Sequence, residues 1–413
     1  AVANRKFTRA LAALLEKFPK AERPIFQAAA DTPAAILFTS GSTGAPKGVR
    51  YTHGMFDAQL DFIRTQYNIQ PGEVDLPMLP VFALFNPALG TTTVTPEMNP
   101  SRPATVDPRK IVQAIEQNHV TYSFGSPALW TKIALYCETR HIALPSIRRV
   151  LIAGAPVHPR LLRSLRTILP NAEIHTPYGA TEVLPVSSIS ATEILHATWD
   201  QTARGMGTCV GRPLPGVETA IIPISDQPVA SVSSTHFLPA DTVGEIIARS
   251  PSCTREYDNN PEATALAKIA DGDTVWHRMG DLGRRDEAGR LWFYGRKAER
   301  VTTPQGPLYT ECCEAIFNTH PKVFRSALIG LGPAGRQKPA LVVEPFPNAF
   351  PRSFYSRQHF LKQLRNLALA HPATQEIDVF FFEKKFPVDV RHNAKIHRLA
   401  LKKKYDRLLD RKK

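Results

Sequence analysis

The sequence has few of the features that mark a metal-binding module, a disulfide scaffold or a membrane protein. Only five of its 413 residues are cysteines, and no two of them form a CxxC pair or another metal-ligand spacing. No apolar run approaches the roughly 20 residues that a membrane-spanning helix needs, so we expect no transmembrane segment. The cysteines are interpreted as mostly buried thiols in a reducing compartment, which predicts a cytoplasmic protein.

Acidic residues are also fewer than basic residues. Lys and Arg number 51 against 37 Asp and Glu, which gives a formal net charge of +14. Such an excess suits a polyanion such as ATP, an acidic membrane surface or a nucleic acid. Basic and aromatic residues are not interleaved, so no nucleic-acid partner is expected. The strongly basic segment 395–413 is interpreted as a solvated helix, with peripheral contact to acidic lipids or binding to a partner as the alternative.

The first half of the chain predicts an α/β domain. From residue 35 to about 200, short β-branched or apolar runs alternate with longer segments of helical periodicity. The helical candidates are 56–66, 108–118, 127–140 and 159–168, and the strand candidates include 121–124, 150–153 and 172–175. We assign residues 1–205 to this α/β part of a large domain.

Two further parts follow it. Residues 206–297 hold short apolar runs separated by Gly, Pro and Asp, with a hairpin turn at 286–289, and are assigned to a β-rich subdomain of the large domain. Residues 298–413 are predicted to form a mobile α+β domain in which 327–331 and 340–343 pair as strands. The predicted fold class is therefore α/β, with a large N-terminal domain and a small α+β C-terminal domain.

One stretch, TSGSTGAPKG at 39–48, predicts a phosphate-binding loop. It directly follows the apolar run 34–38, which is interpreted as a buried strand. Its glycines let backbone N–H groups approach a ligand, its hydroxyls add donors, and Lys47 adds a positive charge. A Walker A loop requires glycine immediately before the lysine, whereas Lys47 lies between Pro46 and Gly48. A P-loop NTPase or kinase is therefore disfavoured.

Further motifs supply other groups that a nucleotide needs. TPYGATE at 176–182 offers an aromatic face, a hydroxyl and a carboxylate able to hold Mg²⁺. Asp281 and Arg296 offer a carboxylate for two ribose hydroxyls and a nearby cation. GAP at 154–156 ends an apolar strand, where backbone could line an adenine pocket, and NAKIHRLAL carries Lys395 near the end of the small domain.

In this order and at these distances, the motifs resemble the adenylate-forming superfamily of AMP-dependent synthetases and ligases. The resemblance covers essentially the whole chain and implies ATP and Mg²⁺ as cofactors. It implies that Lys395 is the catalytic lysine, that Thr181 contacts the α-phosphate and that Glu182 binds Mg²⁺. It implies nucleotide-binding roles for Thr39, Ser40, Gly41, Ser42, Thr43, Gly44, Lys47, Gly154, Ala155, Pro156, Tyr178, Gly179, Asp281 and Arg296.

The chain departs from this family at its start and at its hinge. The phosphate loop begins at residue 39, so we expect that an N-terminal part of the large domain is missing from this chain. The hinge segment GRKAERVTTPQGPLYTECCE carries Ala298 and Glu299, and the turn after them is shortened. In acyl-CoA synthetases this segment helps to form the thioester-making conformation after domain rotation. Its alteration weakens the case for CoA as the acceptor.

The segment 79–90 is a third departure, because it lacks the histidine that relatives often carry there. Phe82, Leu84 and Phe85 make it apolar, which suits a substrate pocket for a long alkyl chain. Simple core packing is the alternative.

With these departures, the chain resembles the β-lactone synthetases of bacterial olefin biosynthesis. Two further segments share the resemblance, VLPVSSISATEI after the YGATE motif and LYTECCEAIFN after the hinge. The resemblance implies adenylation of a long-chain 2-alkyl-3-hydroxyalkanoic acid, followed by attack of its own 3-hydroxyl on the acyl-adenylate carbonyl. The products are a β-lactone, AMP and pyrophosphate, and other olefin-biosynthesis enzymes are candidate partners. Two alternatives stay open: a long-chain fatty acyl-CoA ligase, and a non-catalytic nucleotide-binding subunit of an assembly.

Overall fold

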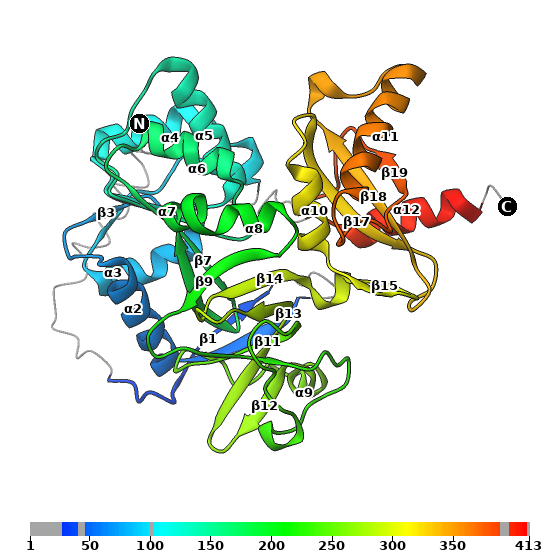
Figure 1. Ribbon diagram of the computed structural model, residues 1–413. Helices are drawn as coiled ribbons and strands as arrows, with labels where there is room; N and C mark the ends of the chain where they lie inside the picture. Colours follow the sequence, from blue (N-terminus) through cyan, green and yellow to red (C-terminus); the bar gives the residue numbers. More distant parts are fainter. Residues whose placement is uncertain (1–26, 40–45, 100–101, 389–395, 411–413) are drawn as a thin grey trace.

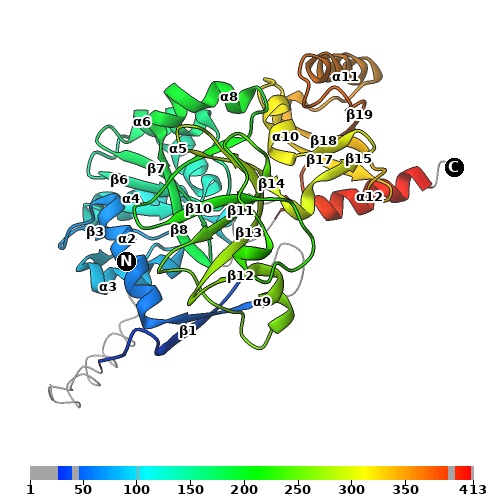
Figure 2. The same ribbon diagram turned by 60° about the horizontal axis from the view of Figure 1, so that its bottom comes forward.

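A computed structural model describes residues 27–39, 46–99, 102–388 and 396–410. They form a large domain and a small C-terminal domain, which lie side by side in Figures 1 and 2. No helix in these ranges is long and apolar enough to cross a membrane. All five cysteines are free and buried, as predicted.

One twelve-stranded sheet runs through the large domain. In spatial order its strands are β10 (Glu218–Ile222), β11 (Gly244–Arg249), β13 (Thr274–Arg285), β14 (Leu291–Arg296), β9 (Thr208–Pro213), β8 (Val183–Ser190), β7 (Glu173–Ala180), β6 (Arg149–Ile152), β5 (Tyr122–Gly125), β3 (Val74–Asp75) and β4 (Thr92–Thr93), with β12 (Lys268–Asp271) paired to β13. The strands from β4 to β7 run parallel, and from β7 to β10 each neighbour is antiparallel.

The mixed α/β fold class is thus confirmed, and the α/β and β-rich parts share one sheet. The sheet passes from β8 to β9 without a break, so the division at residue 205 stays a prediction. The turn predicted at 286–289 joins β13 to β14, where the Gly289 N–H donates to the Asp286 carbonyl at 2.9 Å.

Three helices that cover the parallel strands begin at prolines, and all three have the predicted bounds. Each proline follows a residue whose side chain accepts a backbone N–H of the first turn: Asp107, Ser126 and His158. The helices pack together (Figure 2) and bury their apolar faces in one core. Their bounds are α4 (Pro108–Asn118), α5 (Pro127–Arg140) and α6 (Pro159–Ile168). The remaining helices of the large domain are α2 (His53–Tyr67), η1 (Pro80–Phe85), α3 (Asn86–Leu89), η2 (Pro103–Thr105), α7 (Ala191–Glu193), η3 (Ile194–Thr198), α8 (Trp199–Ala203), η4 (Val232–Ser234) and α9 (Pro261–Ala267).

The strand before the phosphate loop is present but is not buried. β1 (Pro33–Phe38) pairs only with β2 (Gly48–Thr52), in a two-stranded antiparallel sheet. Ile36 is 46% exposed and Phe38 is 66% exposed. The prediction of a buried strand was wrong because the small sheet packs mainly through Val49 and Tyr51 of β2, which are buried.

The small C-terminal domain has a three-stranded sheet at its centre. The predicted strand pair is confirmed, because β17 (Val323–Leu331) and β18 (Lys338–Pro345) are antiparallel neighbours, and β19 (Val379–Phe382) adds in parallel. The other elements are η5 (Lys297–Glu299), β15 (Val301–Thr303), β16 (Gly306–Leu308), α10 (Thr310–Asn318), η6 (Pro347–Ala349), α11 (Phe354–Leu369) and α12 (Arg398–Asp410).

The basic C-terminal helix differs from its prediction. α12 was expected to be a solvated helix, yet it buries Leu401 and Tyr405 in a core with Ala327 and Ile329 of β17. Its basic residues surround an apolar stripe, which packs the helix against the sheet.

Candidate active site

A cavity of about 630 Å³ lies between the large domain and the C-terminal domain, and both domains line it. Nine of the predicted binding residues that precede the hinge meet there. They are Gly154, Ala155, Pro156, Tyr178, Gly179, Asp281, Arg296, Phe82 and Phe85. The cavity therefore joins the predicted nucleotide contacts to the predicted acyl pocket.

Asp281 is the centre of a buried polar group at this cavity. The ladder of β13 and β14 places it directly opposite Arg296, whose Nη1 donates to Asp281 Oδ1 at 2.7 Å. The Tyr178 hydroxyl donates to Asp281 Oδ2 at 2.6 Å. Burial and the neighbouring carboxylate raise the pKa of Tyr178 well above its usual value, so Tyr178 stays a neutral donor. Each Asp281 oxygen keeps lone pairs with which to accept further hydrogen bonds.

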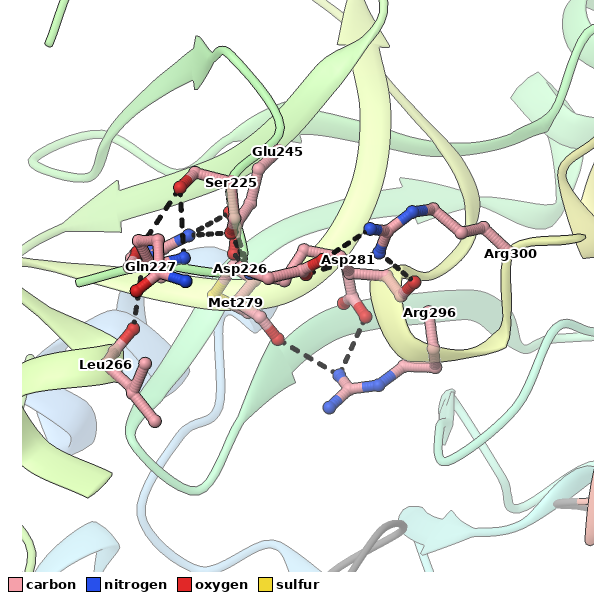
Figure 3. Close-up of polar contacts among 11 residues, drawn as sticks. Ser225, Asp226, Gln227, Glu245, Leu266, Met279, Asp281, Arg296 and Arg300 are labelled. Carbon is pink, nitrogen blue, oxygen red and sulfur yellow. Dashed lines mark hydrogen bonds and ion pairs between the residues drawn. The ribbon is translucent and has the colours of Figure 1, made fainter. Parts of the chain in front are cut away.

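Arg296 is held by more than this one carboxylate. Figure 3 shows its guanidinium reaching Asp281 and the carbonyl of Met279, to which Nη1 donates at 3.0 Å. Just after it, Arg300 donates to Asp226 at 2.6 Å. These bonds anchor the end of β14 and the start of the hinge to the large domain.

The segment 154–156 leaves β6 in a turn that suits glycine. Gly154 has φ +95°, in the left-handed region that favours glycine. The three residues of this segment line the cavity, and their contact with adenine stays a prediction.

Thr181 and Glu182 form the turn between β7 and β8, and two tyrosines hold them. The Tyr51 hydroxyl donates to the Thr181 carbonyl. The Tyr257 hydroxyl donates to Glu182 Oε1 at 2.6 Å, while the other oxygen, Oε2, accepts no hydrogen bond from the described residues. Burial raises the pKa of Tyr51 to about 12, and burial together with Glu182 raises the pKa of Tyr257. Both tyrosines are therefore neutral donors at any physiological pH.

Tyr257 also connects Glu182 to the phosphate loop. The Lys47 ammonium lies over its ring, 5.0 Å from the centroid. Thr39 and Lys47 hold the two ends of the loop together, because the Thr39 N–H donates to the Lys47 carbonyl at 3.0 Å. The predicted loop residues Ser40, Gly41, Ser42, Thr43 and Gly44, and the predicted catalytic lysine Lys395, lie outside the described residues.

The predicted acyl pocket is only partly as expected. Phe82 and Phe85 line the cavity, and Phe82 stacks on Phe124 with ring centroids 3.6 Å apart. Leu84 is 62% exposed and does not line the cavity. Residues three apart share a side of a 3₁₀-helix, so η1 turns Phe82 and Phe85 inward and Leu84 outward.

A charge cluster from the hinge and the C-terminal domain closes the other side of the cavity. Arg398 donates to Glu299 at 2.8 Å and makes a two-bonded pair with Glu314 at 2.7 and 2.8 Å. Glu311, which accepts from the Thr208 hydroxyl at 3.1 Å, stands beside them. Three carboxyl groups thus face one guanidinium.

Sequence reasoning missed this cluster and the role of Tyr257. Two glutamates three residues apart in TECCE, on an otherwise apolar helix, were an available signal for the cluster. Tyr257 gave no comparable signal, because its partner Glu182 lies 75 residues away in the chain.

Glu311 makes stability depend on pH. Loss of hydration raises its pKa from 4.5 to about 7, with the Glu314 charge adding to the shift and Arg398 opposing it. The folded state then holds a proton that the unfolded state releases. The stability that this proton contributes is complete below pH 4.5 and is lost as the pH rises through about 7.

We therefore expect Glu311→Gln to flatten the pH dependence of unfolding. The wild type should lose stability between pH 5 and pH 8, and the variant should lose less. Urea unfolding midpoints at four pH values measure this difference. Equal slopes for the two proteins would show that Glu311 titrates normally.

Comparisons with known proteins give matches over most of the chain. Residues 3–258 match the family model described as AMP-binding enzyme. The chain is 49% identical over 379 residues to the olefin beta-lactone synthetase of Xanthomonas campestris pv. campestris, covering 90% of this chain and 67% of the relative. It is 47% identical over 374 residues to the olefin beta-lactone synthetase of Stenotrophomonas maltophilia, covering 89% of this chain and 66% of the relative. The chain thus spans about two thirds of the length of these relatives.

Solved structures share the fold. The amide bond synthetase McbA from Marinactinospora thermotolerans superposes with a TM-score of 0.73 at 24% identity, over 97% of this chain and 78% of that one. ATP-bound MatB from Rhodopseudomonas palustris gives a TM-score of 0.72 at 22% identity, over 97% of this chain and 73% of that one. At these identities the likeness supports the architecture alone.

Proposed function

Because this chain belongs to the AMP-binding enzyme family, we propose that it adenylates a long-chain 2-alkyl-3-hydroxyalkanoic acid with ATP and closes the product to a β-lactone. One observation carries the adenylation. Asp281, Arg296, Tyr178 and the segment 154–156 converge on a single cavity that continues along the apolar side chains Phe82 and Phe85. The names of the two bacterial relatives support the lactone as the product.

The residues present fit a nucleotide. The carboxylate of Asp281 has lone pairs for two ribose hydroxyls, and the backbone of 154–156 offers a wall for adenine. Lys47 supplies positive charge for the phosphates. We assign the loop residues 40–44 and Lys395 to phosphate binding and to the α-phosphoryl group by resemblance alone.

The residues present also fit Mg²⁺. Residues 27–39, 46–99, 102–388 and 396–410 contain no cluster of three or more His, Cys, Asp or Glu that could cage a metal. Mg²⁺ commonly binds through one or two carboxylates together with substrate phosphates, and Glu182, fixed through Oε1, is such a carboxylate. When bound, Mg²⁺ neutralises charge that develops on the phosphates.

In this reaction the protein mainly has to position the two substrates and to neutralise negative charge. The substrate carboxylate is ionised at neutral pH, so it attacks the α-phosphorus without a protein base, and the bond to the leaving pyrophosphate breaks. The 3-hydroxyl oxygen then bonds to the carbonyl carbon, the bond from that carbon to AMP breaks, and the hydroxyl proton passes to solvent. Positioning of the acid beside the nucleotide in one cavity accelerates both steps.

We extend the proposal to the surroundings of the enzyme. The C-terminal domain is proposed to move about a hinge at Ala298 and Glu299. The protein is proposed to be cytoplasmic. Other enzymes of olefin biosynthesis are its candidate partners. The exposed basic residues of α12 are a candidate contact for acidic lipids.

An assay of products tests the proposed function. The protein is incubated with ATP, Mg²⁺ and a racemic long-chain 2-alkyl-3-hydroxy acid, with and without CoA, and organic products are identified by NMR alongside AMP. We expect β-lactone and AMP without CoA. Thioester formed only with CoA would identify an acyl-CoA ligase instead, and nucleotide binding without AMP release would indicate a non-catalytic subunit.

A further inference from the structure

The C-terminal domain has a positively charged helix on its surface. No acidic residue occurs between Glu344 and Glu376, and α11 lies within this stretch. Four basic residues occur there, all of them exposed: Arg352, Arg357, Lys362 and Arg365. The helix and the residues just before it therefore present positive charge to solvent without any negative charge of their own.

These four cations are not neutralised from elsewhere in the fold. Among the described residues, the ion pairs of this domain involve other cations, and none of the four takes part in one. The guanidinium of Arg357 lies over the Phe382 ring, 5.5 Å from its centroid, which leaves its charge uncompensated. Lys362 and Arg365 are three residues apart on the helix, so they are neighbours and repel each other. An anionic partner would relieve this repulsion.

The helix turns one side toward the domain and the other toward solvent. Three residues of the inward side are buried in the core of the domain: Phe360, Leu364 and Ala368. Tyr355, Lys362 and Leu369 follow one another at intervals of about two helical turns, so they lie together on the outward side. In both Figure 1 and Figure 2, α10 lies between α11 and the large domain. The outward side therefore faces away from the large domain.

Large apolar side chains lie at both ends of this outward side. In the first turn, Phe354 is 71% exposed and Tyr355 is 85% exposed, and their rings meet edge to face with centroids 6.0 Å apart. In the last turn, Leu369 is 70% exposed. Apolar side chains gathered on a surface mark a site of contact. We define the outer face of α11 by five residues: Phe354, Tyr355, Lys362, Arg365 and Leu369.

An acidic membrane surface matches both properties of the outer face. Its phosphate groups attract Lys and Arg, and the boundary between its headgroups and acyl chains takes up aromatic and aliphatic side chains. A nucleic acid also offers phosphates, and its bases stack on aromatic rings. It has no apolar layer for Leu369, however, so the outer face fits lipid better.

We propose that the outer face of α11 docks the protein on an acidic lipid surface. The helix lies in the plane of the surface, with Lys362 and Arg365 on the phosphates of the headgroups. The apolar side chains at its two ends enter the layer just beneath them. A long-chain acid partitions into the same layer, so docking brings the protein to its substrate; only this last point rests on the proposed function.

This surface is distinct from the exposed basic residues of α12. The two helices cover opposite sides of the central sheet of the domain, because α11 packs on Leu341 and Val343 of β18 and α12 packs on Ala340 and Val342. Two basic residues of α12 are already paired, Lys402 with Asp406 and Lys404 with Glu383. One flat membrane cannot contact both helices in this way, so variants of each can separate them.

Flotation with lipid vesicles tests the proposal. The full chain is mixed with vesicles of phosphatidylcholine alone, or of phosphatidylcholine and phosphatidylglycerol at about three to one. We expect binding to the acidic vesicles alone, and weaker binding as salt is added. No binding to acidic vesicles, or equal binding to both kinds, overturns the proposal. Binding to double-stranded DNA that is as tight as binding to acidic vesicles overturns the choice of lipid.

Three double variants locate the contact. Lys362→Gln with Arg365→Gln should bind acidic vesicles about 30-fold more weakly. Phe354→Ser with Tyr355→Ser should lose at least about tenfold without any change of charge. The matched control is Lys403→Gln with Arg407→Gln, which removes the same charge from exposed positions of α12 and should change binding less than about threefold.

The outcome can be read independently of the enzyme's activity. A loss in the α12 variant as large as that in the Lys362 and Arg365 variant overturns the assignment to α11, as does unchanged binding in either α11 variant. Circular dichroism confirms that each variant is folded. Flotation needs neither ATP nor an acid, so its failure leaves the product assay untouched, and a protein that forms no lactone can still bind vesicles.

Discussion

Replacing Glu182 with glutamine is expected to lower kcat/KM for adenylation by at least about a hundredfold. The amide has the shape of the carboxylate and can still accept the hydrogen bond from Tyr257, which is 2.6 Å long in the wild type. It lacks the negative charge with which Glu182 would hold Mg²⁺. Removing one preorganised group of this kind costs about 10²–10³ in rate.

The measurement is ATP–pyrophosphate exchange as a function of Mg²⁺ concentration. The Mg²⁺ concentration at half-maximal rate should rise in Glu182→Gln, while circular dichroism stays that of the wild type. Tyr257→Phe is the matched control, because it keeps the charge of Glu182 and removes only the bond that orients it. Its loss should be smaller and should be relieved by more Mg²⁺. An unchanged Mg²⁺ dependence in Glu182→Gln would mean that Glu182 does not bind the metal.

Arg398→Ala should have the largest effect on stability, about 3–5 kcal/mol in the free energy of unfolding. The guanidinium is the shared partner of Glu314 and Glu299, and both carboxylates are buried. Its removal leaves two carboxyl groups out of water with no cation. The size of the effect comes from leaving the two carboxylates unpaired, and not from the net contribution of the ion pair to stability.

Denaturant unfolding of the wild type and of three variants measures this. Arg398→Lys keeps the charge but cannot make the two-bonded contact with Glu314, so it should be intermediate. Adding Glu314→Gln to Arg398→Ala should recover part of the loss, because one stranded carboxylate is gone. If Arg398→Ala lowers the free energy of unfolding by less than about 1 kcal/mol, the cluster contributes no more than an exposed ion pair does.

The bounds of helices that begin and end with local capping signals were predictable. α4, α5 and α6 each begin with a capping side chain followed by proline, and α4 and α5 end where His119 and His141 adopt the left-handed conformation. These features act within a few residues, so the bounds were read from the sequence alone.

Exposure was harder to predict than conformation. The run 34–38 was correctly interpreted as a strand, but whether a strand is covered depends on which elements lie against it. The prediction that Leu84 lines the acyl pocket was wrong for a related reason. Composition marked the segment as apolar, while the 3₁₀ turn decided which side chains face the cavity.

Contacts between distant parts of the chain were beyond sequence reasoning. Motifs placed Asp281 and Arg296 together because a short hairpin separates them. The pairs Tyr257 with Glu182 and Arg398 with Glu314 bridge 75 and 84 residues.

The single sheet has a consequence for the order of chemical events. The proposed adenine and ribose contacts lie on, or directly follow, β6, β7, β13 and β14, and these strands belong to one hydrogen-bonded sheet. Under the proposed hinge rotation, the hydrogen bond from Thr208 of the large domain to Glu311 of the C-terminal domain breaks, while all of those contacts stay in place. The nucleotide can thus stay in one position while the opposite wall changes. An enzyme that first activates an acid and then cyclises it needs this, because its leaving group must stay bound between the two steps.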